Sequence, residues 1–309
     1  MKISVIGIGA MGSIYAALMA QSGHEVCAID TWVEHINEIK MNGLRIEGAS
    51  GDRIVQNISV STDIQISKNS NLYIISTKSS HVESVAKELS SFIKAGQIVL
   101  TIQNGLGSAE RVAKYINPEN IIIGVAEGFG ASVIKPGHVH HNAMKLIRLG
   151  EMKKVTMKRV EELSKVWMAA GFETKAFSDI NRLMWEKFIS NVTFSGPCAV
   201  FACTLGELIS TPYQWSIAIG CMREAYEIGI KRGVSFSFDE PEQYVRDFGN
   251  RMPNAKPSML LDHEKSRLSE INAINGMVFN LGQVMGIKTP YNEAITAMVI
   301  KKEETLGAK

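Results

Sequence analysis

Three glycines near the start of the chain, Gly7, Gly9 and Gly12, have the spacing Gly-x-Gly-x-x-Gly between an apolar run and a helical pattern. In such a strand–turn–helix unit the first glycine makes the tight turn. The second lets the backbone approach a pyrophosphate, and the third lets the helix pack closely on the strand. The phosphate charge then lies at the N–H groups that open the helix, here those of Ala10 and Met11. The spacing predicts a dinucleotide site, with an accidental glycine turn as the alternative.

A second strand pattern, over residues 25–29, ends at Asp30, 18 residues after Gly12. An acidic side chain at this position can accept hydrogen bonds from both hydroxyl groups of an NAD ribose. The N-terminal apolar run also imitates a secretory signal peptide, but glycines interrupt it and no small-x-small cleavage site follows. The context therefore favours the dinucleotide interpretation.

Composition excludes several classes of protein. The 309 residues predict two domains, and a formal net charge of +2 leaves no basic stripe for nucleic acid. No run of 18 or more apolar residues is present, so the sequence does not predict a membrane-spanning helix. The four cysteines lack metal-ligand spacing and lie in apolar surroundings, which indicates reduced thiols in a cytoplasmic protein; they are Cys27, Cys198, Cys203 and Cys221.

The first half of the chain alternates strand and helix signals, which predicts a doubly wound parallel sheet. The expected strands are 3–6, 26–29, 72–76, 98–101 and 121–125. Helical patterns follow over 13–21, 82–93 and 108–115, and a shorter antiparallel continuation is expected around 137–141 and 145–150.

From residue 180 onward a period of 3.6 residues dominates, which predicts an all-helical second domain. The expected helices are 180–200 (one helix, or two that meet near Gly196-Pro197), 213–232, 258–285, and a last one opened by Thr289 as N-cap and Pro290. The predicted domains are 1–178 and 179–309. Ligands of open sheets bind outside the carboxyl ends of the strands, so the cleft between the halves is the expected site.

An ordered set of motifs from Met1 to about residue 300 resembles the ketopantoate reductase family. Beyond the glycine spacing, the motifs are Ser76-Thr77-Lys78, Gln103-Asn104-Gly105-Leu106-Gly107, Trp185 to Asn191, Gly206-Glu207-Leu208, Pro257 to Leu260, Glu270 to Gly276, and Thr289 to Asn292. The resemblance implies a Rossmann domain followed by a helical domain like that of 6-phosphogluconate dehydrogenase. It also implies reduction of a 2-oxo acid at its ketone by a nicotinamide hydride.

Lys187 matches the catalytic lysine of that family. Hydride delivery to a ketone leaves an alkoxide, so a proton donor must stand beside that oxygen. Asn191 follows at i+4 on the same helix face and resembles the family's substrate-binding asparagine. Partial burial would lower the pKa of the Lys187 ammonium and make it a better acid. The alternative is a solvated helix lysine.

Four further residues take their roles from the resemblance. Ser258 corresponds to the serine that binds the substrate carboxylate, although its other role is helix capping. Glu270 corresponds to the glutamate that binds substrate hydroxyl groups, so it is predicted, with Lys187, as a catalytic residue; it is expected on one helix face with His263. Asn104 matches the asparagine at the junction of nicotinamide and substrate. Lys78 matches a lysine near the cofactor, with a solvent-facing role as the alternative.

The chain departs from the family pattern at two positions. Thr31, preceded by Asp30, replaces the arginine that neutralises the 2′-phosphate of NADPH, which favours NAD(H) over NADP(H). Leu205 replaces an asparagine that helps to hold the substrate, so a substrate other than ketopantoate is expected. The segment 127–141 is also unusual, because it contains His138, His140 and His141 without a nearby acidic or cysteine ligand; a surface or cleft strand, and no metal, is expected.

The residues and the resemblance together predict an NADH-dependent reductase of a small 2-oxo acid. One alternative is an authentic NADPH-dependent ketopantoate reductase of pantothenate synthesis. Another is a non-catalytic NAD(P)-sensing module, against which the joint retention of Lys187, Asn191, Ser258 and Glu270 argues. The oligomeric state stays open, with a homodimer as one expectation.

Overall fold

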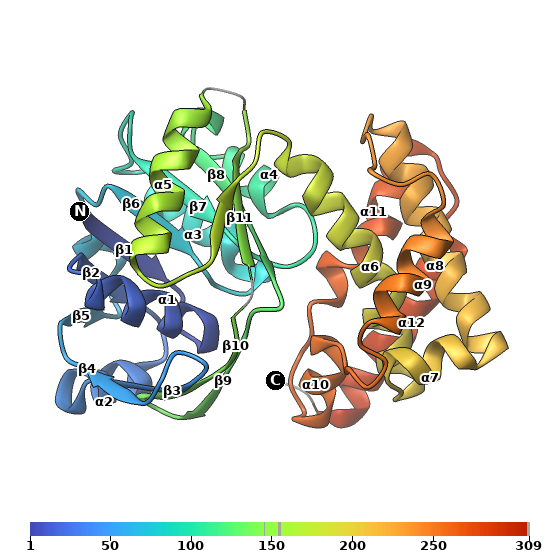
Figure 1. The fold of residues 1–309 in the computed structure, drawn as a ribbon, viewed down its shortest axis with the longest axis horizontal. Helices are drawn as coiled ribbons and strands as arrows, with labels where there is room; N and C mark the ends of the chain where they lie inside the picture. The colour runs from blue at the N-terminus through green and yellow to red at the C-terminus, as the bar shows by residue number, and fades with distance from the viewer. Residues whose placement is uncertain (145, 154–155, 308–309) are drawn as a thin grey trace. The chain divides into compact units, whose positions relative to one another are not determined.

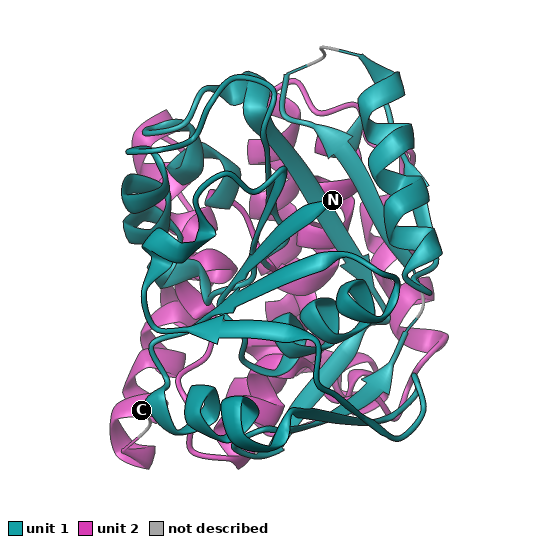
Figure 2. Ribbon diagram, turned by 90° about the vertical axis from the view of Figure 1, so that its left-hand side faces the viewer, with its two compact units in different colours: residues 1–103, 108–180 teal, residues 104–107, 181–309 magenta. Residues whose placement is uncertain are grey.

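The computed structural model describes residues 1–144, 146–153 and 156–307. It divides into two compact units, coloured separately in Figure 2. Unit 1 comprises residues 1–103 and 108–180, and unit 2 comprises residues 104–107 and 181–309. The short segment Asn104–Gly107 therefore belongs to the helical unit although the chain on both sides of it belongs to the sheet unit.

Unit 1 is built on an eight-stranded sheet with the order β12-β11-β8-β7-β6-β1-β2-β5 (Figure 1). Its strands are β1 (Lys2–Ile6), β2 (Glu25–Ile29), β5 (Ile58–Ser61), β6 (Leu72–Ile75), β7 (Ile98–Thr101), β8 (Ile121–Glu127), β11 (Leu146–Glu151) and β12 (Thr174–Ala176). Only the pair β8–β11 is antiparallel among the pairs of this sheet. The doubly wound parallel sheet expected from the apolar runs is confirmed.

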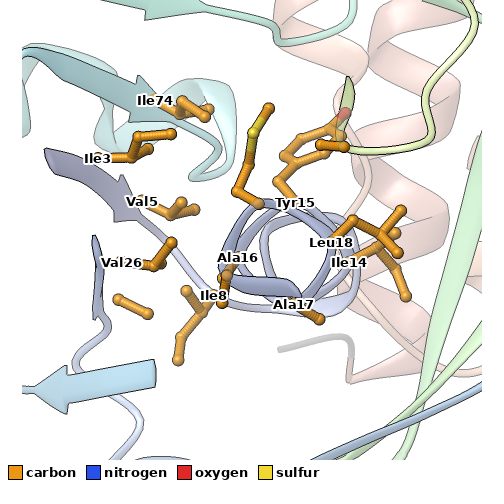
Figure 3. Packing of buried hydrophobic residues seen from close by; sticks show 14 of the residues in the cluster. Ile3, Val5, Ile8, Ile14, Tyr15, Ala16, Ala17, Leu18, Val26 and Ile74 are labelled. Carbon is orange, nitrogen blue, oxygen red and sulfur yellow. The ribbon is translucent and has the colours of Figure 1, made fainter. Parts of the chain in front are cut away.

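Helices cover both faces of this sheet because alternate strand residues point to opposite sides. Ile3, Val5 and Ile74 face a cluster with α1, α2 and α5, part of which is shown in Figure 3. Ile6 and Ile75 face a second cluster with α3 and α4. The helices are α1 (Ala10–Gln21), α2 (Val33–Asn42), α3 (Val82–Leu89), α4 (Ser108–Ala113) and α5 (Met157–Ala169).

A second, four-stranded sheet also belongs to unit 1, and the sequence patterns did not predict it. Its order is β4-β3-β10-β9. The strands are β3 (Leu44–Gly48), β4 (Arg53–Val55), β9 (Gly130–Lys135) and β10 (His138–Ala143). The expected antiparallel continuation at 137–141 is therefore wrong in part. β10 pairs parallel with β3 and antiparallel with β9, whereas β11 continues the main sheet; residue 145 lies outside the described residues.

Unit 2 is helical, with its own apolar core. Its helices are α6 (Ile180–Phe201), α7 (Leu205–Ser210), α8 (Pro212–Lys231), α9 (Pro241–Asn250), α10 (Ser258–Glu264), α11 (Asn275–Met285) and α12 (Pro290–Leu306). α6 is one helix with Pro197 inside it, which settles the alternative left open at Gly196-Pro197. Thr289 is the N-cap residue of α12, but the carboxylate of Glu224 accepts the N–H groups of Tyr291 and Asn292.

The single helix expected over 258–285 is wrong. α10 ends at Glu264, Ser266 has a φ of 50°, and the chain passes through a 3-10 turn at Ile271–Ala273 before α11 begins. The carboxylate of Glu303, on α12, accepts both the N–H and the hydroxyl of Ser269. These tertiary hydrogen bonds favour the irregular path. Glu270 therefore does not share a helix face with His263.

Candidate cofactor and active site

The glycine loop lies where β1 ends, between the flanking strands β2 and β6. The N–H of Gly7 donates to the carbonyl oxygen of Ile29 at 2.8 Å, which ties the end of β1 to the end of β2. From β1 the chain adds β2 on one side and later β6 on the other. This is the topological switch point at which open parallel sheets bind their ligands.

The three glycines meet the space requirements of a pyrophosphate cradle. Gly7 has a φ of +90°, and a Cβ there would lie 2.6 Å from the nitrogen of Thr77. A Cβ at Gly12 would collide with the carbonyl oxygen of Gly7 and lie 2.6 Å from Ser76 Oγ. A Cβ at Gly9, by contrast, would have nothing within 4 Å. The backbone is packed tightly on both sides of Gly9 and open at Gly9 itself, as a phosphate group requires.

Helix α1 begins at Ala10, with Gly9 as its N-cap residue and no side-chain cap. The N–H groups of the first helical turn have no intrahelical acceptor, so those of Ala10, Met11 and Gly12 are suited to an anion. The structure thus places these predicted cofactor residues in one short loop and helix start.

Asp30 directly follows β2. Its Oδ1 accepts the N–H of Trp32 at 2.9 Å, and its own N–H donates to Ser61 at 3.2 Å. These bonds fix the turn that presents the carboxylate, which is partly exposed. Thr31 is exposed beside it, and the first turn of α2 carries a further acid, Glu34, and no lysine or arginine.

Two polar residues at the carboxyl ends of neighbouring strands support the glycine loop and were not among the predicted site residues. Ser76 Oγ donates to Gly7 O at 2.8 Å, and Gln103 Nε2 donates to Ile75 O at 2.6 Å. Both residues belong to motifs that carry the family resemblance, Ser76-Thr77-Lys78 and Gln103-Asn104-Gly105. Lys78 is exposed and is the N-cap residue of a short 3-10 helix at Ser79–His81.

The segment Asn104–Gly107 packs on the turn that precedes α11. Gly105 has a φ of +79°, and a Cβ there would collide with the carbonyl oxygen of Ala273. The next residue, Leu106, donates its N–H to that same oxygen at 3.1 Å. A glycine at position 105 is what permits this approach, which brings Asn104 beside Glu270.

Three of the predicted residues form one polar group inside unit 2. Lys187 Nζ, on α6, donates to Asn104 Oδ1 at 2.9 Å. Asn104 Nδ2 lies 3.5 Å from Glu270 Oε2, at the long limit of a hydrogen bond. Residues separated by 83 and 166 positions in the chain are thus brought together. The group combines a cation, an amide and a carboxylate, which can hold a polar substrate and move a proton.

Desolvation lowers the pKa of Lys187 from 10.5 to about 8, and the negative charge of Glu270 opposes that shift. An ammonium with a pKa near 8 is still largely protonated at neutral pH, yet gives up its proton far more readily than an ordinary lysine. The side chain therefore has the property required of a general acid.

The remaining predicted residues of unit 2 are less closely connected. Asn191 follows Lys187 by one helical turn on α6 and is partly exposed. Ser258 is exposed and is the first residue of α10, where Pro257 rather than Ser258 is the N-cap residue. Leu205 begins α7 with only 3% of its surface exposed and packs in the core of unit 2.

The histidine segment is more buried than expected. His138 Nε2 and His140 Nδ1 lie 2.9 and 3.2 Å from the carboxylate of Glu47, and His141 is buried. The acidic neighbour that the sequence pattern lacked comes from β3, about 90 residues away in the chain and adjacent only through strand pairing. Within the described part of the chain no three His, Cys, Asp or Glu residues form a group that could hold a metal ion.

All four cysteines, which the sequence predicted as reduced thiols, are free and buried. Of the helices in the described ranges, none has the length and apolar character needed to cross a membrane.

Comparisons with known proteins match the whole chain. The family model described as "Ketopantoate reductase PanE/ApbA" matches residues 3–154, and that described as its C terminal matches residues 179–303. A 2-dehydropantoate 2-reductase of Streptococcus pyogenes serotype M3 is 28% identical over 308 residues, or 99% of each chain.

Solved structures agree with these matches. D-mandelate dehydrogenase with NADH and anilino(oxo)acetate has a TM-score of 0.90, 27% identity and 100% coverage of each chain. A PanE/ApbA family ketopantoate reductase from Ralstonia eutropha JMP134 has a TM-score of 0.89 and 25% identity, covering 99% of this chain and 100% of that one.

Proposed function

Since the chain belongs to the ketopantoate reductase family and is an NAD(P)-dependent 2-oxo acid reductase, we propose that it uses NADH and that Lys187 protonates the reduced ketone. The observation that carries this proposal is the group formed by Lys187, Asn104 and Glu270. A sensing module that had lost catalysis would have no need of a desolvated lysine held by an amide.

The glycine loop would hold the pyrophosphate of the cofactor, and the nicotinamide would supply the hydride that reduces the ketone carbon. The ketone oxygen then gains negative charge, and Lys187 Nζ gives it a proton. Asn104 Oδ1 holds the ammonium in place through the 2.9 Å bond. We assign Glu270 to the binding of a substrate hydroxyl, and Asn191 and Ser258 to the remaining polar groups of the substrate, with Ser258 on the carboxylate.

The preference for NADH is argued from the turn after β2. The carboxylate of Asp30 can accept both ribose hydroxyls but repels a 2′-phosphate. Neither Thr31 nor the first turn of α2 supplies a positive charge there. The D-mandelate dehydrogenase structure, which contains NADH, gives this proposal further support. Lys78 would then lie near the cofactor without selecting NADPH.

We propose that the substrate is a 2-oxo acid other than ketopantoate. The support comes from the similarity to D-mandelate dehydrogenase, because mandelate is a 2-hydroxy acid with an aromatic side chain. Leu205 gives no support of its own, since it is buried in the core of unit 2. Authentic ketopantoate reduction is the second candidate, because relatives aligned over 99% of this chain are 2-dehydropantoate 2-reductases.

A substrate panel separates the two candidates. The purified chain would be assayed with NADH and with NADPH against ketopantoate, phenylglyoxylate and aliphatic 2-oxo acids. We expect NADH with a 2-oxo acid other than ketopantoate to give the highest kcat/KM. Ketopantoate with the highest kcat/KM of the panel would restore the second candidate, and no turnover of any 2-oxo acid would remove Lys187 from the assigned role.

A further inference from the structure

His35, on the first turn of α2, lies buried between the parts of unit 1 that are expected to hold the dinucleotide. Its two ring nitrogens have separate partners. The N–H of Gly137, in the turn between β9 and β10, donates to Nδ1 at 3.0 Å. Nε2 lies 3.2 Å from Ser13 Oγ on α1. The imidazole therefore joins two elements that are far apart in the chain.

The hydrogen bonds allow only one protonation state of the ring. Nδ1 accepts from a backbone N–H, so it carries no proton, and the proton of the neutral ring is on Nε2. The hydroxyl of Ser13 donates its single proton to Ile8 O at 2.8 Å, so its oxygen is available to accept from Nε2–H. Every donor faces an acceptor when His35 is neutral. Protonation would place a second N–H against that of Gly137.

The same ring connects the glycine loop with the Asp30 turn. Ile8, whose carbonyl ends the hydrogen-bond chain, stands between Gly7 and Gly9. Trp32 stacks on the His35 ring with centroids 4.8 Å apart and an angle of 12° between the planes. The N–H of Trp32 is the one that fixes the Asp30 carboxylate. His35 thus contacts residues that hold the glycine loop and the Asp30 turn in place, and these two loops are the proposed cofactor contacts. It does not enter the space beside Gly9.

We propose that His35 is a positioning residue of the dinucleotide site, which aligns the glycine loop with the Asp30 turn only while its imidazole is neutral. This inference rests on the proposed location of the cofactor at these two loops. Its consequence is that acidification weakens cofactor binding through a residue that does not itself touch the cofactor.

The surroundings of His35 set the direction of its titration. Burial lowers its pKa below the usual 6.5, while the Asp30 carboxylate and the carbonyl of Ile8 oppose the shift. The other neighbouring charges are Glu38, whose side chain lies against Gly137, and the exposed Lys135 of β9. α1 contributes only the hydroxyl of Ser13. A lowered pKa favours the neutral ring in the folded state, so the aligned state is complete at and above about pH 6.5 and is lost only as the pH falls through the lowered pKa.

The test measures the Kd of NAD⁺ by calorimetry between about pH 4.5 and about pH 7.5, with the thermal midpoint recorded at each pH. NAD⁺ is chosen because NADH decomposes in acid. We expect the wild-type Kd to be level near neutral pH and to rise as the pH falls through the lowered pKa of His35, by about tenfold once the ring is protonated, as loss of one net hydrogen bond implies. His35→Phe keeps a flat ring beneath Trp32 and should have a raised, pH-independent Kd.

Two further variants keep the test decisive if His35→Phe folds poorly. Ser13→Ala removes the Nε2 partner together with the hydroxyl that donates to Ile8 O, and should raise the Kd and the KM for NADH severalfold while kcat changes less than about twofold. His24→Gln is the matched control, because His24 is another histidine of unit 1 with a lowered pKa but lies beside the N-terminus. It should follow the wild-type profile.

The outcomes distinguish this inference from the proposed cofactor location. A wild-type Kd that is level across the pH range, or a profile flattened equally by His24→Gln, would overturn the role of His35. Asp30→Ala tests the location itself. If Asp30→Ala changed neither NAD⁺ affinity nor the preference for NADH, the location would fail, whereas a response of Asp30→Ala with no response of His35→Phe would remove His35 alone.

Discussion

The proposed role of Lys187 as proton donor can be tested with a pH profile. Its pKa is lowered to about 8 by desolvation, so the ammonium needed for ketone reduction is present below about pH 8 and lost above it. We expect kcat for reduction under saturating NADH to be level up to about pH 8 and then to fall. The reverse oxidation, which needs the neutral amine, should rise over the same range. A reduction rate that stayed level to about pH 10 would contradict the assignment.

Replacement of Lys187 tests the same role independently of pH. Lys187→Ala should lower kcat by roughly 10² to 10⁴, the range for loss of a general acid, with little change in NADH affinity. Lys231→Ala is a suitable control, because Lys231 is an exposed lysine of unit 2 that pairs with Glu227 on the same helix. Single-turnover rates and NADH titration of both variants provide the measurement. Full activity of Lys187→Ala would exclude the lysine from the mechanism.

Asp30 and Thr31 are expected to determine cofactor choice. Wild-type kcat/KM should be at least about tenfold higher with NADH than with NADPH, a difference near 1.4 kcal/mol. The double variant Asp30→Ala, Thr31→Arg removes the repulsion and adds a cation, so the preference should narrow or invert. Asp30→Asn alone keeps the size of the side chain and separates charge from shape. A wild-type preference for NADPH would show that another basic residue binds the 2′-phosphate.

At the scale of elements, the loop after β7 depends on one glycine. Gly105→Ala forces a Cβ into the carbonyl oxygen of Ala273 at a φ of +79°. We expect Asn104 to be displaced from Lys187, with kcat lowered about tenfold or more and stability lowered by roughly 1–3 kcal/mol. Gly96→Ala is the matched control, because Gly96 has a φ of +83° but nothing within 4 Å of an added Cβ. It carries the same backbone strain without the collision.

Comparison of the two variants isolates that collision. Chemical denaturation and steady-state kinetics would be measured on both. If Gly96→Ala lowered kcat as much as Gly105→Ala, the close approach to Ala273 would not be what positions Asn104.

The sequence predicted the elements whose signal is local. β1, β6 and β7 are buried on both faces and appear as short continuous apolar runs. β3 and β10 mix exposed or polar residues with buried ones and pair with each other across about 90 residues, so no local pattern revealed their sheet. The break between α10 and α11 was missed for a similar reason, because the carboxylate that holds Ser269 comes from α12.

The site was predictable as a set of residue types and not as a set of contacts. Motif resemblance identified Asn104, Lys187 and Glu270 separately. Their hydrogen bonds depend on the close approach at Gly105 and on the turn that follows α10, neither of which has a periodic signal. Gln103 and Ser76 were quoted as motif members, but their role as supports of the strand ends follows only from their carbonyl partners.

At the scale of the whole molecule, the two units contain separate apolar cores. The proposed contacts to the adenosine half of the cofactor lie in unit 1, whereas the proposed proton donor, Lys187, and the residues that hold it lie in unit 2. A substitution in the core of unit 1 is therefore expected to affect cofactor binding more than proton transfer, and a substitution in the core of unit 2 is expected to do the reverse. Leu205 permits a test, since it is a core residue of unit 2 at a position where the family places a polar residue.

Leu205→Asn should destabilise the helical unit instead of restoring a substrate contact. The side chain is 3% exposed among apolar neighbours, so an amide there would be buried without an assigned partner. The buried amide and the lost apolar contacts together should lower the free energy of unfolding by roughly 2–5 kcal/mol. We therefore expect a lower melting temperature and no gain in ketopantoate turnover. Leu205→Met is the volume-conserving control and should cost less than about 1.5 kcal/mol.

NAD⁺ affinity of the folded Leu205→Asn variant, measured well below its melting temperature, should stay within about twofold of wild type. A variant of unchanged stability that reduced ketopantoate faster would show instead that position 205 reaches the substrate.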